Sequence, residues 1–142
     1  MIILGCDHAG FKLKEKIKNY LLKQNEDIVD VGAFCIDPND DFSHFVELIA
    51  KANDKNENTR IIAVCGSGVG MCIGLNKQKN IRCVLGHTKK EVVLARQHNN
   101  VNALALAGRK ICICKAKRLI SAFLLTEHLG GKYLKRMQSL EE

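Results

Sequence analysis

Cys65 is the residue of this sequence with the clearest chemical potential. It ends an apolar run over residues 60–64, and three glycines follow within five positions, Gly66, Gly68 and Gly70. A thiol between a buried strand and a glycine loop can be a nucleophile, a redox group, a metal ligand, an acid/base group or a core side chain. The types and spacing of the neighbouring residues distinguish among these roles.

The glycine loop after Cys65 suits an anion. Glycines let the backbone turn tightly and point several N–H groups into one concavity, and the start of a helix adds its positive end. Phosphate or a developing oxyanion would bind there, and a purely structural turn is the alternative. A dinucleotide-binding GxGxxG is not met, because Met71 stands at the third glycine. The spacing from Gly5 to Gly10 is Walker-like, but residues 11–13 read Phe-Lys-Leu.

The neighbours of Cys65 argue against some thiol chemistries. A papain-type protease has a second cysteine where Gly68 stands, and a cysteine phosphatase closes its loop with an arginine where Met71 stands. A redox pair would use Cys72, a helical turn or two away. Two interpretations stay open: a thiol that the loop amides and the helix end favour as the thiolate, which is a competent general base, and an inert core cysteine.

Alternating strand and helix patterns must position these residues. Apolar β-branched runs predict strands over 2–4, 27–31, 61–64, 81–85 and 102–107, and amphipathic stretches predict helices over 11–24, 42–53, 88–97, 114–128 and 132–140. A further helix is predicted from the glycine loop to about residue 77. Thr88 and Glu91 form a capping pair, Gly130-Gly131 close the helix over 114–128, and residues 54–59 connect two elements at the surface. The alternation predicts one α/β domain over residues 1–142, with a five-stranded parallel sheet and helices on both faces.

A parallel sheet binds its ligands beyond the carboxyl ends of the strands. The residues that directly follow the predicted strands are therefore candidates for the site. They are Asp7 and His8 after the first strand, Asp41 and His44 beyond the second, Cys65 after the third, His87 after the fourth and Arg109 after the fifth. Polar and ionisable side chains thus gather where this fold places its ligand.

Two further groups lie away from that edge. His98 and Asn99 end a predicted helix before the fifth strand, at the far end of the sheet from Cys65. They form either an ordinary helix C-terminus or part of a neighbouring subunit's site. Lys132 and Arg136 are four residues apart on one helix face, and they either clamp a phosphate or face solvent.

Composition limits the classes of function. A net charge of +7 comes from scattered lysines, and with five Phe, two Tyr and no Trp we expect no nucleic-acid partner. No apolar run approaches the ~18–20 residues of a membrane span, and no signal peptide is expected at the start. Seven cysteines without a CxxC pair predict reduced thiols in the cytoplasm, and Cys112-x-Cys114 is interpreted as core filling rather than as a metal site.

Four motifs stand in order along nearly the whole chain: GCDHAGFKLK at 5–14, CGSGVGM at 65–71, ARQHNNVNALALAGR at 95–109 and GGKYLKRM at 130–137. Together they resemble the type B ribose-5-phosphate isomerases, in the family that also holds galactose- and allose-6-phosphate isomerases. The resemblance implies an aldose–ketose isomerase that works through an enediolate without metal or organic cofactor, in a Rossmann-like three-layer sandwich. Ribose 5-phosphate is the expected substrate. A hexose 6-phosphate, and a non-catalytic sugar-phosphate-binding module, are the alternatives.

The resemblance also implies roles for residues. Cys65 falls on the catalytic base, His98 on the residue that opens the furanose ring, and Ser67 on a hydroxyl position of the catalytic loop. Binding positions match the anion hole (Gly66, Gly68, Val69, Gly70), the sugar contacts (Asp7, His8, Asn99) and the phosphate contacts (Arg109, Lys132, Arg136). The family is dimeric or tetrameric with sites shared between subunits, so we expect a homo-oligomer with the 132–140 helix at an interface.

Two departures from the family pattern concern the fit around the sugar phosphate. Lys132 stands where bacterial members often have arginine, so a bidentate grip becomes a point charge. Residues 41–44 read Asp-Phe-Ser-His, where many members have Asp-Tyr-Pro-His. Neither departure touches the proposed chemistry.

Overall fold

A parallel five-stranded sheet forms the centre of the protein, as predicted. The computed structural model describes residues 1–53, 56 and 58–140, and the connection predicted over 54–59 lies largely outside them. The strands are β1 (Ile2–Cys6), β2 (Ile28–Asp30), β3 (Arg60–Cys65), β4 (Cys83–Leu85) and β5 (Ala103–Ala107), in the order β2-β1-β3-β5-β4. The helices are α1 (Phe11–Lys23), α2 (Phe42–Ala52), α3 (Val69–Asn76), α4 (Lys89–Asn99), α5 (Ile113–Leu125) and α6 (Lys132–Gln138).

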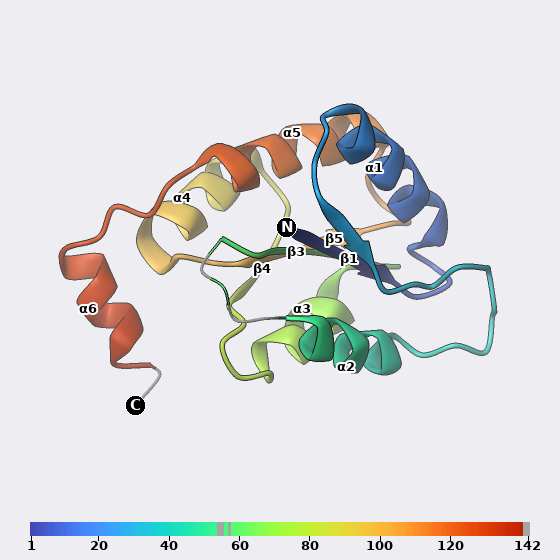
Figure 1. The fold of residues 1–142 in the computed structure, drawn as a ribbon, viewed down its shortest axis with the longest axis horizontal. Coiled ribbons are helices and arrows are strands. Elements are labelled where there is room, and N and C mark those ends of the chain that lie inside the picture. Colours follow the sequence, from blue (N-terminus) through green and yellow to red (C-terminus); the bar gives the residue numbers. More distant parts are fainter. Residues whose placement is uncertain (54–55, 57, 141–142) are drawn as a thin grey trace.

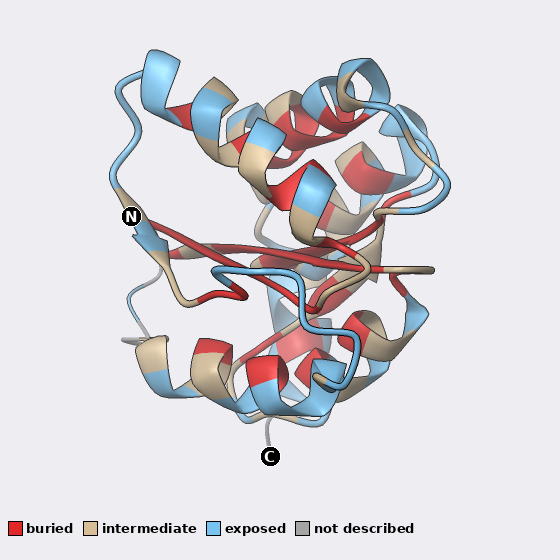
Figure 2. Cartoon of the chain, turned by 90° about the vertical axis from the view of Figure 1, so that its right-hand side faces the viewer, coloured by how far each residue is buried: buried red, intermediate tan, exposed pale blue. Residues whose placement is uncertain are grey.

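Helices cover both faces of the sheet, which confirms the three-layer sandwich. Figure 1 shows α1, α4 and α5 over one face and α2 and α3 over the other, with α6 beside α4 at the sheet's edge. Figure 2 shows the sheet edge-on as a largely buried layer between them. The strands β1, β3 and β5 are buried along almost their whole length, because a parallel sheet covered on both faces needs apolar residues on both sides of each strand.

The strand order creates a switch point between β1 and β3. After β1 the chain moves to β2 on one side, whereas β3 lies on the other side. Cys6 pairs with Val64 in the sheet register, so the segments that follow β1 and β3 leave the sheet side by side. Ligands of open α/β sheets bind in the crevice at such a point.

A hydrogen-bonded lysine in α1 departs from the expected amphipathic pattern. Lys14 is fully buried, and its Nζ lies 2.9 Å from Asp30 Oδ2 and 2.7 Å from Glu15 Oε1; Lys18 Nζ lies 2.8 Å from the same Asp30 oxygen. Burial alone would raise the pKa of Asp30 and lower that of Lys14. The hydrogen bonds outweigh it, so the pKa of Asp30 is lowered and that of Lys14 is raised. Asp30 also accepts from the Gly32 N–H at 3.0 Å, which fixes the turn after β2.

The predicted closure of α5 by two glycines is wrong. The helix ends at Leu125, and Thr126 follows in extended backbone, because its carbonyl oxygen accepts a hydrogen bond from Arg96 Nε at 3.0 Å. Gly130 and Gly131 instead lead into α6, with Gly131 at its N-cap. That last helix ends at residue 138 rather than 140.

Candidate functional site

Three segments meet beyond the carboxyl ends of β1, β3 and β5. They are residues 7–10, the glycine loop (residues 66–70) and Arg109. A Cβ added to Gly66 would lie 3.4 Å from Ala9 Cβ and 3.4 Å from Arg109 Nη1, and the Arg109 N–H donates to the Gly66 carbonyl at 3.1 Å. The structure therefore brings together the candidates that follow the first, third and fifth strands.

Cys65 is buried at the end of β3 and is held by the glycine loop. Its Sγ accepts a hydrogen bond from the Gly68 N–H at 3.2 Å. Gly68 has a left-handed backbone (φ 78°), and a Cβ there would lie 2.6 Å from Leu85 Cδ1, so this position requires glycine. The Ser67 hydroxyl accepts from the Val69 N–H at 3.2 Å. The loop thus aims one N–H at the thiol and uses its hydroxyl to start α3.

The first turn of α3 supplies donors beside that thiol. The N–H groups of Gly70 and Met71 belong to the first turn, where no acceptor inside the helix is available to them. The same end of the helix carries the positive pole of the helix dipole. The loop and the helix together can hold a phosphate group or a negatively charged oxygen close to Cys65.

Asp7 and His8 occupy different environments next to the loop. The Asp7 carboxylate accepts from the Gly10 N–H at 2.9 Å, and burial raises the pKa of Asp7 in spite of this bond. His8 Nδ1 lies 2.6 Å from Asp40 Oδ1, which also accepts from the His8 backbone N–H at 3.0 Å. Sequence reasoning missed Asp40, and its place just before a helix cap was the only signal that could have pointed to it.

The two candidates beyond the second strand have structural partners. Asp41 is the N-cap of α2 and accepts from the Ser43 N–H at 3.2 Å. The His44 ring packs edge-on against Phe45, with ring centroids 5.3 Å apart. Asp41 therefore serves the start of the helix, and its neighbour Asp40 serves His8.

A second cluster lies at the opposite end of the sheet. His98, in the last turn of α4, stacks on Tyr133 with ring centroids 4.3 Å apart. Lys132 Nζ and Arg136 Cζ lie 5.2 and 5.7 Å from the centroid of the same ring. The cluster stands just before β5 begins, whereas Cys65 pairs with Ala107 at the end of that strand. The predicted catalytic residues thus fall into two groups within one subunit, and sequence reasoning missed Tyr133 as the organiser of the second.

Asn99 lies beside this second cluster. Together with residues of β4 and of the α6 segment, it lines a cavity of about 300 Å³. Asn99 is the last residue of α4, and Asn100, in a left-handed conformation, caps the helix. Asn99 is therefore placed with His98 rather than with Cys65.

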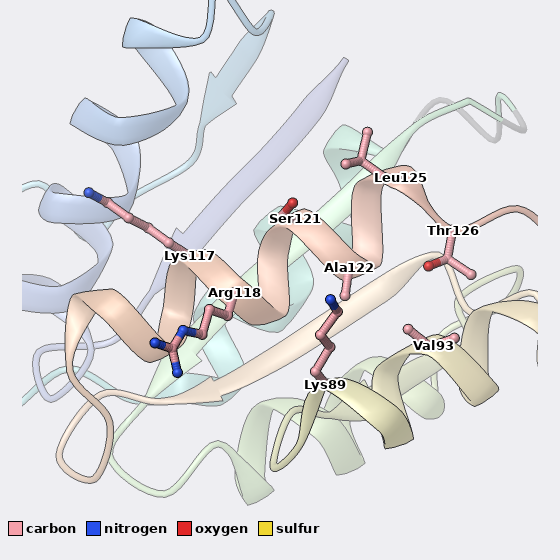
Figure 3. A pocket seen from close by; sticks show the side chains of 8 residues that line it. All are labelled: Lys89, Val93, Lys117, Arg118, Ser121, Ala122, Leu125 and Thr126. Atoms are coloured by element: carbon pink, nitrogen blue, oxygen red, sulfur yellow. The ribbon is translucent and has the colours of Figure 1, made fainter.

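A larger groove between α4 and α5 holds none of the predicted site residues. It encloses about 570 Å³ and is lined by Lys89, Val93, Lys117, Arg118, Ser121, Ala122, Leu125 and Thr126 (Figure 3). Its cations do not converge, because Lys117 and Arg118 extend away from Lys89 in Figure 3. Lys117 Nζ instead lies 5.1 Å from the centre of the Tyr20 ring.

The prediction that Cys112 and Cys114 fill the core is wrong. Cys112 and Cys114 are both exposed at the start of α5, so they do not fill the core, because a helix start at the sheet's edge faces solvent. Across the residues that the structure describes, no group of three or more His, Cys, Asp or Glu could hold a metal ion. Within the same residues, every helix is too short or too polar to cross a bilayer.

The fold and the site together define a class of protein. A parallel α/β sheet carries at its switch point a buried thiol, a loop of backbone donors and an arginine, an arrangement whose donors and charge suit a small anionic ligand. The sequence profile of the Ribose/Galactose Isomerase family matches residues 2–140, and the chain belongs to this family. The resemblance drawn from the four motifs is thereby confirmed.

Relatives match the chain over almost its full length. Ribose-5-phosphate isomerase B of Escherichia coli is 33% identical over 139 residues, which cover 98% of this chain and 93% of the relative. Probable ribose-5-phosphate isomerase B of Mycoplasma pneumoniae is 34% identical over 136 residues, 96% of this chain and 90% of the relative. The crystal structure of ribose-5-phosphate isomerase B from Mycoplasma genitalium with bound ribulose-5-phosphate is similar, with a TM-score of 0.93 at 33% identity and coverage of 99% and 93%.

Proposed function

We propose that the protein is an aldose–ketose isomerase that interconverts ribose 5-phosphate and ribulose 5-phosphate. Its family membership and the relatives of matching length support this activity. The observation that carries the proposal is the 3.2 Å contact between the Gly68 N–H and Cys65 Sγ at the start of α3. This contact supports a role for the Cys65 thiol as the base, with the N–H groups at the start of α3 as donors to a negative oxygen.

Cys65 and the glycine loop divide the chemistry between them. As a thiolate, Cys65 takes the proton from C2 of the open-chain aldose and returns it to C1, while the proton of the C2 hydroxyl passes to O1, which gives the ketose. The loop N–H groups hold the enediolate oxygen while the proton is on sulfur. A preorganised donor of this kind contributes about 3–4 kcal/mol, and a positioned base contributes roughly 10²–10⁴-fold in rate. This scheme uses only the chain's own groups.

The second cluster serves a neighbouring subunit's site in this proposal. His98 opens the furanose ring there and Asn99 contacts the sugar. Lys132 and Arg136 bind the phosphate together with Arg109 of the subunit that supplies the thiol. The support is their separation from Cys65 along β5, since a group at the wrong end of its own sheet can act only on another copy. A homodimer or homotetramer with α6 at the interface follows.

Asp7 and His8 contact the sugar in the same scheme. They leave β1 beside the glycine loop, and His8 keeps 27% of its side chain exposed. A cytoplasmic enzyme fits the free state of all seven cysteines, because reducing compartments keep thiols unpaired. A small sugar phosphate is the partner that we propose, without nucleic acid or membrane.

Activity on three sugar phosphates tests the proposal. We expect wild-type protein to isomerise ribose 5-phosphate in preference to allose 6-phosphate and galactose 6-phosphate. Cys65→Ala should lower kcat at least about 10²-fold, since it removes the base, whereas Cys35→Ala, which changes an exposed thiol, should leave kcat unchanged. Full activity of Cys65→Ala would contradict the assignment of the base. Turnover of hexoses alone would change the substrate, and no turnover at all would indicate a binding module.

A further inference from the structure

The carboxylate of Asp40 holds His8 at two points. Asp40 Oδ1 accepts from the His8 backbone N–H at 3.0 Å and lies 2.6 Å from His8 Nδ1. An ionised carboxylate only accepts hydrogen bonds, so Nδ1 must carry a proton. Nε2 is then the ring nitrogen that remains for another partner, and the His8 side chain is partly open to solvent.

The chain around Asp40 connects His8 to the glycine loop. Asp40 directly precedes Asp41, the N-cap of α2, so the rigid start of a helix fixes its backbone. Phe42, the first residue of that helix, packs against the loop: a Cβ added to Gly70 would lie 3.1 Å from its ring atoms. The segment over residues 40–42 therefore sets the position of His8 relative to the loop that holds the thiol.

The arrangement of Asp40 is not one that stability alone favours. Its side chain is 12% exposed, and its Oδ2 is buried with no hydrogen-bond partner in the described part of the chain. Burying a carboxylate oxygen without a donor costs free energy. A carboxylate behind a histidine has a known benefit, because it fixes which ring nitrogen is protonated and how the ring is turned.

We propose that Asp40 is a positioning residue of the isomerase site, which fixes the ring orientation and tautomer of His8 so that Nε2 meets the sugar in one defined state. The inference rests on the proposed function, in which His8 contacts the substrate. Asp40 itself does not touch the sugar and acts only through the imidazole. The proposal also gives Asp40 a role distinct from that of its neighbour Asp41, which caps α2.

A double-mutant cycle on ribose 5-phosphate isomerisation tests the proposal. Asp40→Ala should lower kcat/KM about 10- to 100-fold, the range seen when the partner behind a metal-ligating histidine is removed. Asp40→Asn keeps an oxygen that accepts from both N–H groups and should lose clearly less. In a His8→Ala background, Asp40→Ala should change kcat/KM less than about threefold, because the group through which it acts is gone. Asp41→Asn, which retains a capping oxygen, is the matched control and should keep wild-type kcat/KM.

Thermal unfolding separates this role from a structural one. The Tm of Asp40→Ala should stay within about 3 °C of the wild type. Equal losses of kcat/KM in both backgrounds would overturn the proposal, and so would a fall in Tm with kcat/KM per folded molecule unchanged. If the wild type is active and either Asp40→Ala or His8→Ala leaves kcat/KM unchanged, this inference alone is overturned. An inactive wild type overturns the proposed function and the inference with it.

Discussion

Cys65 and Cys72 lie seven positions apart in the sequence, yet their surroundings give the two thiols different partners. Cys65 accepts from the Gly68 N–H. The Cys72 thiol lies 3.7 Å from the Cys83 carbonyl oxygen and accepts from Asn76 Nδ2 at 3.6 Å, and it also interacts with the Cys83 side chain. The hydrogen bond from Cys83 outweighs the opposing effect of burial and lowers the pKa of Cys72 to about 7. The structure therefore pairs Cys72 with Cys83 instead of with the catalytic candidate.

The reactivity of Cys72 should report this environment. Only the thiolate reacts with an alkylating agent, so the labelling rate of Cys72 by iodoacetamide should rise about tenfold from pH 6 to pH 8 and then level off. Peptide mass spectrometry follows each cysteine separately. Cys83→Ala removes the hydrogen bond and should move the midpoint of the Cys72 profile to higher pH. A wild-type profile that still climbs steeply at about pH 9, near the ordinary thiol value, would contradict the prediction.

At the scale of single elements, the sequence predicted what depends on local chemistry. The capping pair of Thr88 and Glu91 forms as expected, with the Glu91 N–H donating to Thr88 Oγ1 at 3.2 Å, because both groups lie within one helical turn. Burial of Lys14 could not be predicted, since its partner Asp30 comes from another element. The end of α5 was missed for the same reason, because the distant Arg96 fixes the carbonyl that follows it.

The glycine loop has a matched pair of tests. Gly68 and Gly130 both have positive φ, but a Cβ at Gly68 would meet Leu85 Cδ1 at 2.6 Å, whereas nothing lies within 4 Å of one at Gly130. Both Ala variants carry the left-handed strain of roughly 1–2 kcal/mol. Gly68→Ala adds overpacking of about 1–3 kcal/mol and moves the donor to Cys65, so it should lower both Tm and kcat. Equal effects of the two variants on kcat would show that the close packing at Gly68 does not matter for the reaction.

At the scale of the whole molecule, topology explains which site residues could be foreseen. The parallel order of strands placed Asp7, Cys65 and Arg109 at one edge, because carboxyl ends of parallel strands share an edge. Asp40 could not be placed, since the path of the loop after β2 depends on contacts such as the bond from Gly32 to Asp30. His98 was expected at the other end of the sheet, and its place in the last turn of α4 confirms this.

The proposed sharing of sites between subunits makes a quantitative prediction for mixed dimers. One chain carries Cys65→Ala and the other His98→Ala, with different affinity tags so that the heterodimer is isolated. If each site joins Cys65 of one subunit to His98 of its partner, one site of the heterodimer carries both changes and the other carries neither. The heterodimer should then regain about half of the wild-type isomerase activity per dimer, although each variant is impaired as a homodimer.

The control pairs a wild-type chain with one carrying both substitutions, which alters both shared sites and should leave little activity. The opposite pattern, with an impaired first heterodimer and about half activity in the control, would place each complete site within one subunit.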